Sequence, residues 1–88
     1  MTKTELHPTN GRKSFYGKAI VEDYGNGHKR LLSYDTPVCV IKDGEAKLLK
    51  DWDYSNTTVI HVRTFLETNG FYAGSKAEIG KTYKRASK

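Results

Sequence analysis

The sequence predicts an α+β fold in which a four-stranded antiparallel meander carries one amphipathic helix, from the C-terminal half of the chain, on one face. Three observations predict it. Strand-length segments between residues 15 and 52 are separated by turn-forming residues. One longer segment, 54–70, has apolar residues at helical spacing between a start signal and a stop signal. With 88 residues the chain has room for one two-layer core.

Both ends of the chain are expected to lie outside this core. Residues 1–13 show neither strand nor helix periodicity, so we expect a flexible arm. Residues 73–88 are rich in Lys and Arg and predict a basic tail. Within the tail, Ser75 and Glu78 have the spacing of a capping box, which predicts a short helical turn. A single domain then occupies residues 14–72.

Four segments have the lengths and patterns of strands. The first alternates between its two faces, and Gly17 within it predicts a bulge or a close backbone approach. The third is apolar on both faces, which is typical of a central strand. Asp43-Gly44 before the fourth is a two-residue hairpin signal, and successive short connections predict a meander. The expected strands are residues 15–22, 28–34, 38–42 and 45–52.

The expected helix begins at Ser55 or Asn56, either of which can cap it, and ends at Asn69-Gly70. Four of its apolar residues share an arc of about 120° on a helical wheel, so this face should lie on the sheet. These residues are Val59, Val62, Phe65 and Leu66.

The wheel places the apolar Ile60 on the polar side of this helix, beside Arg63, Thr64 and Glu67. Such a residue either contacts a partner or packs under the C-terminal tail, and packing is the commoner outcome in small domains. If Ile60 contacts a partner, its neighbours on this face should do so too. The candidate partner-binding residues are therefore Ile60, Arg63, Thr64 and Glu67. His61 falls at the edge of the buried arc, where we expect a half-buried ring bonded to a backbone carbonyl.

The formal net charge is +5, and the excess positive charge lies at the two ends of the chain. Lys and Arg interleaved with Tyr are typical of proteins that bind single-stranded nucleic acid with little sequence preference. Solubility explains a charge of this size equally well. The candidate nucleic-acid-binding residues are Arg12, Lys13, Lys18, Lys29, Arg30, Lys81, Tyr83, Lys84 and Arg85.

No pattern of residues predicts catalysis, a metal or a cofactor. The three histidines and the single Cys39 are too far apart in sequence to form a metal-ligand pair. Residues 74–82 (GSKAEIGKT) are similar to a phosphate-binding loop, but five residues separate the glycines where the motif has four. We expect a non-enzymatic protein, with general acid–base catalysis by His61 as an alternative. We expect it in the cytoplasm, because neither a membrane-spanning run nor a signal peptide is present.

A set of short motifs resembles a family of uncharacterised proteins carried by bacteriophages and other mobile elements of gut bacteria. The motifs are SFYGKA (14–19), LSYDT (32–36) and YSNTT (54–58), followed by His61, Phe65 and Asn69-Gly70. The resemblance implies a single small domain and such an origin, but no reaction. Members often carry Arg directly before the matching His, whereas this chain has Ile60.

Small proteins of such elements frequently act by occupying host machinery, including defence nucleases such as CRISPR effectors. The resemblance therefore implies an inhibitor that docks on a host protein or nucleoprotein in the bacterial cytoplasm. Direct binding of DNA or RNA is the alternative. A meander also leaves two unpaired edges, which predicts a homodimer through one of them.

Overall fold

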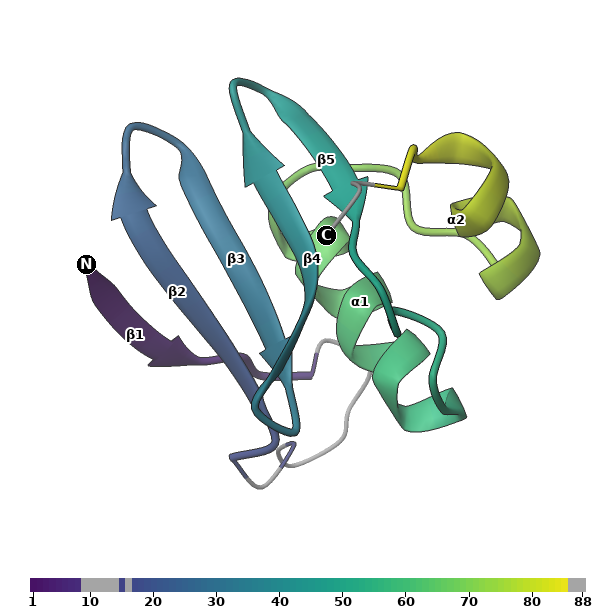
Figure 1. The fold of residues 1–88 in the computed structure, drawn as a ribbon, viewed down its shortest axis with the longest axis horizontal. Helices are drawn as coiled ribbons and strands as arrows, with labels where there is room; N and C mark the ends of the chain where they lie inside the picture. Colours follow the sequence, from purple (N-terminus) through teal and green to yellow (C-terminus); the bar gives the residue numbers. More distant parts are fainter. Residues whose placement is uncertain (9–14, 16, 86–88) are drawn as a thin grey trace.

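The computed structural model describes residues 1–8, 15 and 17–85. The predicted α+β class is confirmed, with one antiparallel sheet and two helices in the described residues (Figure 1). In chain order the elements are β1 (Thr2–Glu5), β2 (Ala19–Gly25), β3 (His28–Ser33), β4 (Thr36–Lys42), β5 (Glu45–Leu48), α1 (Asn56–Thr68) and α2 (Lys76–Thr82).

The sheet is a meander with spatial order β1-β2-β3-β4-β5, and each neighbouring pair is antiparallel. The prediction of four strands is wrong, because Thr2–Glu5 pairs with β2 as a fifth strand. The segment expected as a flexible arm therefore contains an edge strand, and Leu6 directly after it is buried. The side chains of this strand are mostly exposed, so it has no alternating pattern to detect. Residues 9–13 of the expected arm lie outside the described residues.

β2 begins at Ala19, four residues later than predicted. Gly17 has a φ of +73° and lies in a turn, next to Lys18, whose backbone N–H donates to the carbonyl of Phe15 at 2.9 Å. Gly17 therefore separates Phe15 from the strand instead of marking a bulge within it. Phe15 is nevertheless buried, because its ring packs edge-on against His61 of α1 at a centroid distance of 4.5 Å.

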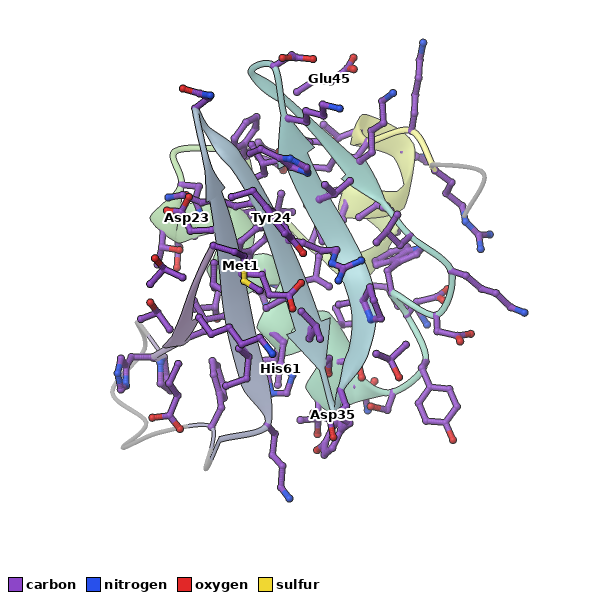
Figure 2. The ribbon with its side chains drawn as sticks, turned by 60° about the vertical axis from the view of Figure 1, so that its left-hand side comes forward. Met1, Asp23, Tyr24, Asp35, Glu45 and His61 are labelled. Carbon is purple, nitrogen blue, oxygen red and sulfur yellow. The ribbon has the colours of Figure 1, made fainter. Side chains whose placement is uncertain are left out.

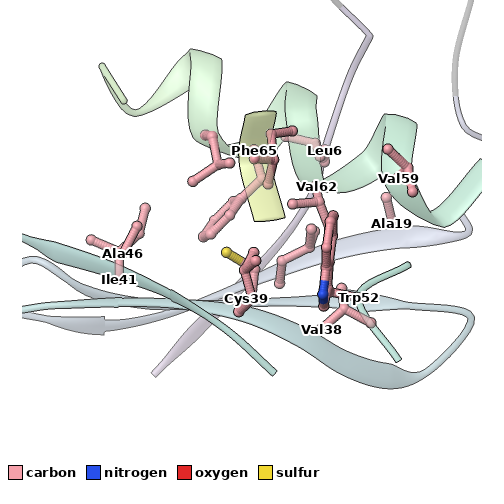
Figure 3. Close-up of a cluster of buried hydrophobic side chains, with 14 of the residues drawn as sticks. Leu6, Ala19, Val38, Cys39, Ile41, Ala46, Trp52, Val59, Val62 and Phe65 are labelled. Carbon is pink, nitrogen blue, oxygen red and sulfur yellow. The ribbon is translucent and has the colours of Figure 1, made fainter. Parts of the chain in front are cut away.

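Helix α1 lies over one face of the sheet, and buried apolar side chains fill the space between them (Figures 1 and 3). Val62, Phe65 and Leu66 are fully buried and Val59 is nearly so, which confirms the predicted core face of this helix. They form one cluster with Leu31 of the central strand and other sheet residues. Burying one side chain of this size stabilises the fold by about 1.5–3 kcal/mol.

Both ends of α1 have the predicted capping residues. Ser55 caps the N-terminus, where its hydroxyl accepts a hydrogen bond from the backbone N–H of Thr58 at 3.2 Å. At the C-terminus, Gly70 N–H donates to the carbonyl of Glu67, and Phe71 N–H donates to that of Leu66. This pair of bonds is a Schellman motif, which requires the left-handed backbone that Gly70 supplies with a φ of +81°.

Helix α2 extends the core beyond β5. The capping box of Ser75 and Glu78 is confirmed, since each side chain bonds to the backbone N–H of the other residue. Ile79 of this helix is fully buried. Gly80 faces Trp52, and a Cβ added there would lie 3.4 Å from the indole Cζ2, which is ordinary contact. The helix is therefore a packed element that is longer than the single turn predicted.

The chain after α2 runs along β5. The backbone N–H of Leu48 donates to the carbonyl of Lys84 at 2.9 Å, and Arg85 forms a parallel bridge with Leu48. The segment expected as a tail is thus docked on the sheet as far as Arg85. This segment covers part of the β5 edge. The homodimer predicted to form through a sheet edge would therefore use the edge of β1. That expectation stays a prediction.

Two glycine substitutions should change stability in opposite directions. Gly80→Ala should raise the free energy of unfolding by roughly 0.5–1 kcal/mol, because Gly80 is helical and has room for a methyl group. Gly70→Ala should lower it by about 1 kcal/mol or more, because an L-residue is strained at positive φ. Urea unfolding followed by circular dichroism measures both. A loss of stability in Gly80→Ala as large as that in Gly70→Ala would contradict the packing of α2 on Trp52.

Candidate functional site

The four candidate partner-binding residues of α1 do not form one exposed face. Arg63 and Glu67 are exposed, but Thr64 is only 6% exposed. The prediction that Thr64 contacts a partner is therefore not supported, because its side chain is buried. Ile60 is half-buried and packs against the hydrophobic core, whereas its packing under the C-terminal tail stays a prediction.

The candidate nucleic-acid-binding residues are dispersed over the molecule. Lys29 faces α1, where its Nζ donates to Asn69 Oδ1 at 2.9 Å. Arg30, the next residue along β3, points to the other face of the sheet and pairs with Glu22 at 2.7 Å. Lys18 is exposed near the start of β2. The sheet does not bring these three cations together.

The C-terminal candidates differ in exposure, because three are exposed and one is packed against other residues. Lys81, Lys84 and Arg85 are exposed. Tyr83 is half-buried, its hydroxyl donates to the carbonyl of Tyr72 at 2.6 Å, and its ring packs against Phe71. Tyr83 therefore supports the fold of this segment and is poorly placed to stack on a base. Arg12 and Lys13 lie outside the described residues.

A buried chain of polar side chains joins α1 to β3. His61 is fully buried, not half-buried as expected, and its Nδ1 lies 2.8 Å from the hydroxyl of Ser33. The Ser33 hydroxyl donates to Thr58 Oγ1 at 3.2 Å, and Ser55 Oγ donates to the same atom at 3.2 Å. The partner of Nδ1 is a hydroxyl, and a bond from the ring to a backbone carbonyl stays a prediction. Spacing along the chain gave no signal for the hydroxyl partner, because Ser33 and His61 are 28 residues apart.

Ser33 and His61 are a nucleophile type and a base type within hydrogen-bond distance, but their arrangement does not favour catalysis. Ser33 Oγ lies within hydrogen-bond distance of both Thr58 Oγ1 and His61 Nδ1, and the tautomer of His61 decides whether Nδ1 donates or accepts. Ser33 is only 3% exposed. Cys39 is fully buried, and burial raises the pKa of its thiol to about 12, which suppresses the reactive thiolate.

A hollow of about 240 Å³ opens above this polar chain, between the β3–β4 hairpin and the N-terminus of α1. Tyr34 and Tyr54 both line it and are 49% and 80% exposed. Two of the motifs named above, LSYDT (32–36) and YSNTT (54–58), meet here although they are far apart in sequence. The lining residues are Ser33, Tyr34, Thr36, Val38, Asp51, Tyr54 and Thr58.

The backbone around the hollow adopts conformations that non-glycine residues seldom take. Tyr34 and Asp35 form the two-residue β3–β4 turn with φ values of 51° and 67°, and Asp51 has a φ of 66°. Such turns usually contain Asn-Gly, because a left-handed L-residue costs about 1–2 kcal/mol. The surrounding structure therefore holds an exposed tyrosine ring at a position where glycine or asparagine is ordinary.

Acidic side chains gather at this end of a basic protein. Asp51 lines the hollow, and Asp53 is exposed beside it in sequence. Figure 2 shows Asp35 at the tip of the β3–β4 hairpin, at the opposite end of the sheet from Glu45. Cations also lie nearby, since Lys50 is exposed directly before Asp51 in sequence and Lys18 Nζ is 6.0 Å from the centroid of the Tyr34 ring.

The face of the sheet opposite α1 has its own charged network, centred on Glu22. The Glu22 carboxylate is nearly buried, and it accepts hydrogen bonds from Tyr24 OH at 2.5 Å and from Arg30 Nε at 2.8 Å. These two bonds, together with the charges of Arg30 and Lys3, lower the pKa of Glu22 in spite of its burial. Arg30 is therefore paired with Glu22, although 38% of its side chain is exposed.

The lowered pKa of Glu22 predicts a pH-dependent contribution to stability. The contribution is present above the ordinary carboxyl pKa of 4.5 and is lost as the pH falls through the lower folded value. Glu22→Gln should therefore be less stable than the native protein at pH 7, and the difference in melting temperature should shrink below pH 4.5. Glu45→Gln is the matched control, because its side chain is 62% exposed. A difference that stays constant with pH would contradict this account of Glu22.

Comparison with known proteins adds a family but no activity. A family model described as a family of unknown function (DUF8033) matches residues 2–81. No curated protein matches the chain, and no solved structure does. In the described part of the chain, no helix has the length and apolar character needed to cross a membrane. The same residues contain no group of three or more His, Cys, Asp or Glu side chains placed to hold a metal ion.

Proposed function

Because the chain belongs to DUF8033, a family of unknown function, its role has to be inferred from its own surface, and we propose that it is a non-enzymatic protein that docks on another protein. The observation that carries this proposal is the exposure of Tyr34 and Tyr54 on the rim of one hollow. Tyrosine is enriched at the energetic centres of protein interfaces, because its large ring loses little conformational entropy on binding. Tyr54 has 80% of its surface in solvent, so the fold gives no packing reason for its size.

The charges at this end favour a protein partner over nucleic acid. Asp51 lines the hollow, and Asp35 and Asp53 are exposed near it in sequence. Carboxylates at this density oppose a phosphate backbone, whereas they complement a basic protein surface. Tyr34 and Tyr54 thus lie in an acidic setting.

The resemblance to proteins of bacteriophages and mobile elements supplies the class of partner. We propose a host protein or nucleoprotein in the bacterial cytoplasm, such as the effector nuclease of a CRISPR defence system. Binding alone is sufficient for inhibition, because a small domain that occupies a nuclease surface excludes the substrate. The proposal therefore requires no catalytic group in this chain.

The proposal predicts that capture of a host protein depends on Tyr34 and Tyr54. Tagged native protein, incubated with nuclease-treated lysate of a bacterial host, should retain a specific protein. Tyr54→Ala and Tyr34→Ala should each weaken the measured affinity for that protein by at least about 30-fold, the effect of losing roughly 2 kcal/mol at an interface hot spot. Tyr72→Ala is the control, because Tyr72 is 55% exposed but does not line the hollow.

The experiment can contradict either the proposed docking site or the proposed function. Retention that survives both substitutions at Tyr34 and Tyr54 would place the docking surface elsewhere and overturn the proposed site. If nuclease-treated lysate gives no protein and interference by CRISPR effectors is unaffected in cells, the proposed function fails. Circular dichroism of each variant confirms that the fold is intact, and Tyr54→Ala is the safer variant because its ring is mostly in solvent.

Direct nucleic-acid binding is the second candidate, and the exposed C-terminal cations favour it. Lys81, Lys84 and Arg85 are exposed, and none of the three forms an ion pair with another residue that the structure describes. A labelled single-stranded oligonucleotide added to the same preparations tests it. If this candidate is right, the affinity of the protein for the oligonucleotide should fall steeply between 50 and 200 mM salt. A protein that makes six phosphate contacts loses roughly 10³-fold or more over this range. Lys84→Ala should also weaken the binding.

A further inference from the structure

We propose that the hollow between Tyr34 and Tyr54 receives one arginine side chain of the partner protein. The inference rests on the proposed docking function and names the chemistry that the docking site recognises. The volume limits what can enter. At about 240 Å³ the hollow is smaller than the roughly 300–1,000 Å³ of pockets that hold drug-sized ligands. It is suited to one side chain.

The lining selects a positive charge. Among the lining residues, Asp51 carries a carboxylate, and Tyr34 and Tyr54 carry aromatic rings, whose faces attract cations. The hydroxyl of Thr36, which is exposed and also lines the hollow, has lone pairs that can accept hydrogen bonds. Among the lining residues that the structure describes, none is a Lys, Arg or His. A cation in the hollow would lie close to acceptor oxygens and aromatic rings. Its hydrogen bonds to these oxygens would replace the ones that it made to water.

Arginine fits this lining better than lysine does. Its guanidinium group is planar, so it stacks on a tyrosine ring while its forked N–H groups donate to a carboxylate in two parallel bonds. It is also less strongly hydrated than an ammonium group, so less free energy is needed to bring it into the hollow. The shared rim of Tyr34, Tyr54 and Asp51 offers both of these interactions at once.

Lys18 lies near the rim, with its Nζ 6.0 Å from the Tyr34 ring centroid. It shows that a positive charge already rests near this ring in the free protein. An arriving arginine would be repelled by it, so Lys18 should weaken binding slightly. Lys18→Ala is therefore expected to strengthen binding, an effect opposite to that of removing Asp51.

The chain offers a matched pair of acid substitutions for the test. Asp51 lines the hollow and has a φ of 66°, and Asn tolerates this left-handed backbone as well as Asp does. Asp51→Asn thus removes the charge and keeps the turn. Asp53 is two residues away and exposed, but it does not line the hollow. Asp53→Asn removes the same charge from the molecule without changing the site.

The experiment uses the intact protein and a defined probe. The tripeptide acetyl-Gly-Arg-Gly-amide is titrated into the ¹⁵N-labelled chain, and amide shifts are followed by NMR. We expect saturable shifts confined to residues 33–36 and 51–58, with a millimolar dissociation constant. Asp51→Asn should weaken binding at least threefold, and Asp53→Asn should leave it within a factor of two. The peptide with citrulline in place of arginine should give no saturable shift.

Other results overturn the inference. They are the absence of saturable shifts near the hollow, equal weakening by the two acid substitutions, equal binding of acetyl-Gly-Lys-Gly-amide, or tighter binding of adenosine monophosphate at the same residues. Failure here is distinct from failure of the proposed function. If capture of a host protein requires Tyr54 but is unaffected by Asp51→Asn, the proposed docking function is supported and only the inference of a bound arginine is overturned.

Discussion

The contact of α1 with one face of the sheet is the interaction on which the rest of the structure depends. Phe65 and Leu66 reach zero exposure against sheet residues that include Leu31 and Leu48. A single long helix covers only one face, so the other face has to be stable in water. Its central carboxylate, Glu22, is held by cross-strand partners and not by a second layer of structure.

The same contact determines the geometry of the proposed docking end. Because α1 is capped at Ser55, the preceding Tyr54 projects from its N-terminus beside the β3–β4 hairpin that carries Tyr34. The buried hydrogen bonds from Ser33 to Thr58 and His61 hold the hairpin and helix together. The two rings are therefore placed before a partner arrives. Preorganisation of this kind reduces the entropy lost on binding.

Local signals in the sequence predicted the helix well. The spacing of Val59, Val62, Phe65 and Leu66 identified the face on the core, and the capping residues Ser55 and Gly70 lie where the helix begins and ends. The capping box of α2 was predicted for the same reason. These features depend on residues within a few positions of one another, which is the range over which periodicity carries information.

The errors have a common physical cause, since each depends on contacts between distant segments. Strand β1 exists through its pairing with β2, although Thr2–Glu5 has no apolar alternation of its own. Thr64 is polar but buried, because the helix sits more deeply in the molecule than a 120° arc implies. The sequence did not predict the hollow that we propose as the docking end, because Tyr34 and Tyr54 are brought together by the fold, whereas Ile60 was conspicuous only on a helical wheel.

The central claim is that the Tyr34 and Tyr54 end is the surface through which this protein meets its partner. A photoreactive benzoylphenylalanine placed at position 54, and separately at position 72, tests it directly in the bacterial cytoplasm. Both native side chains are exposed tyrosines, so both positions accept the larger ring. The account predicts a discrete covalent adduct with one host protein from position 54 and none from position 72. Adducts of equal yield from both positions, or none from position 54, would contradict it.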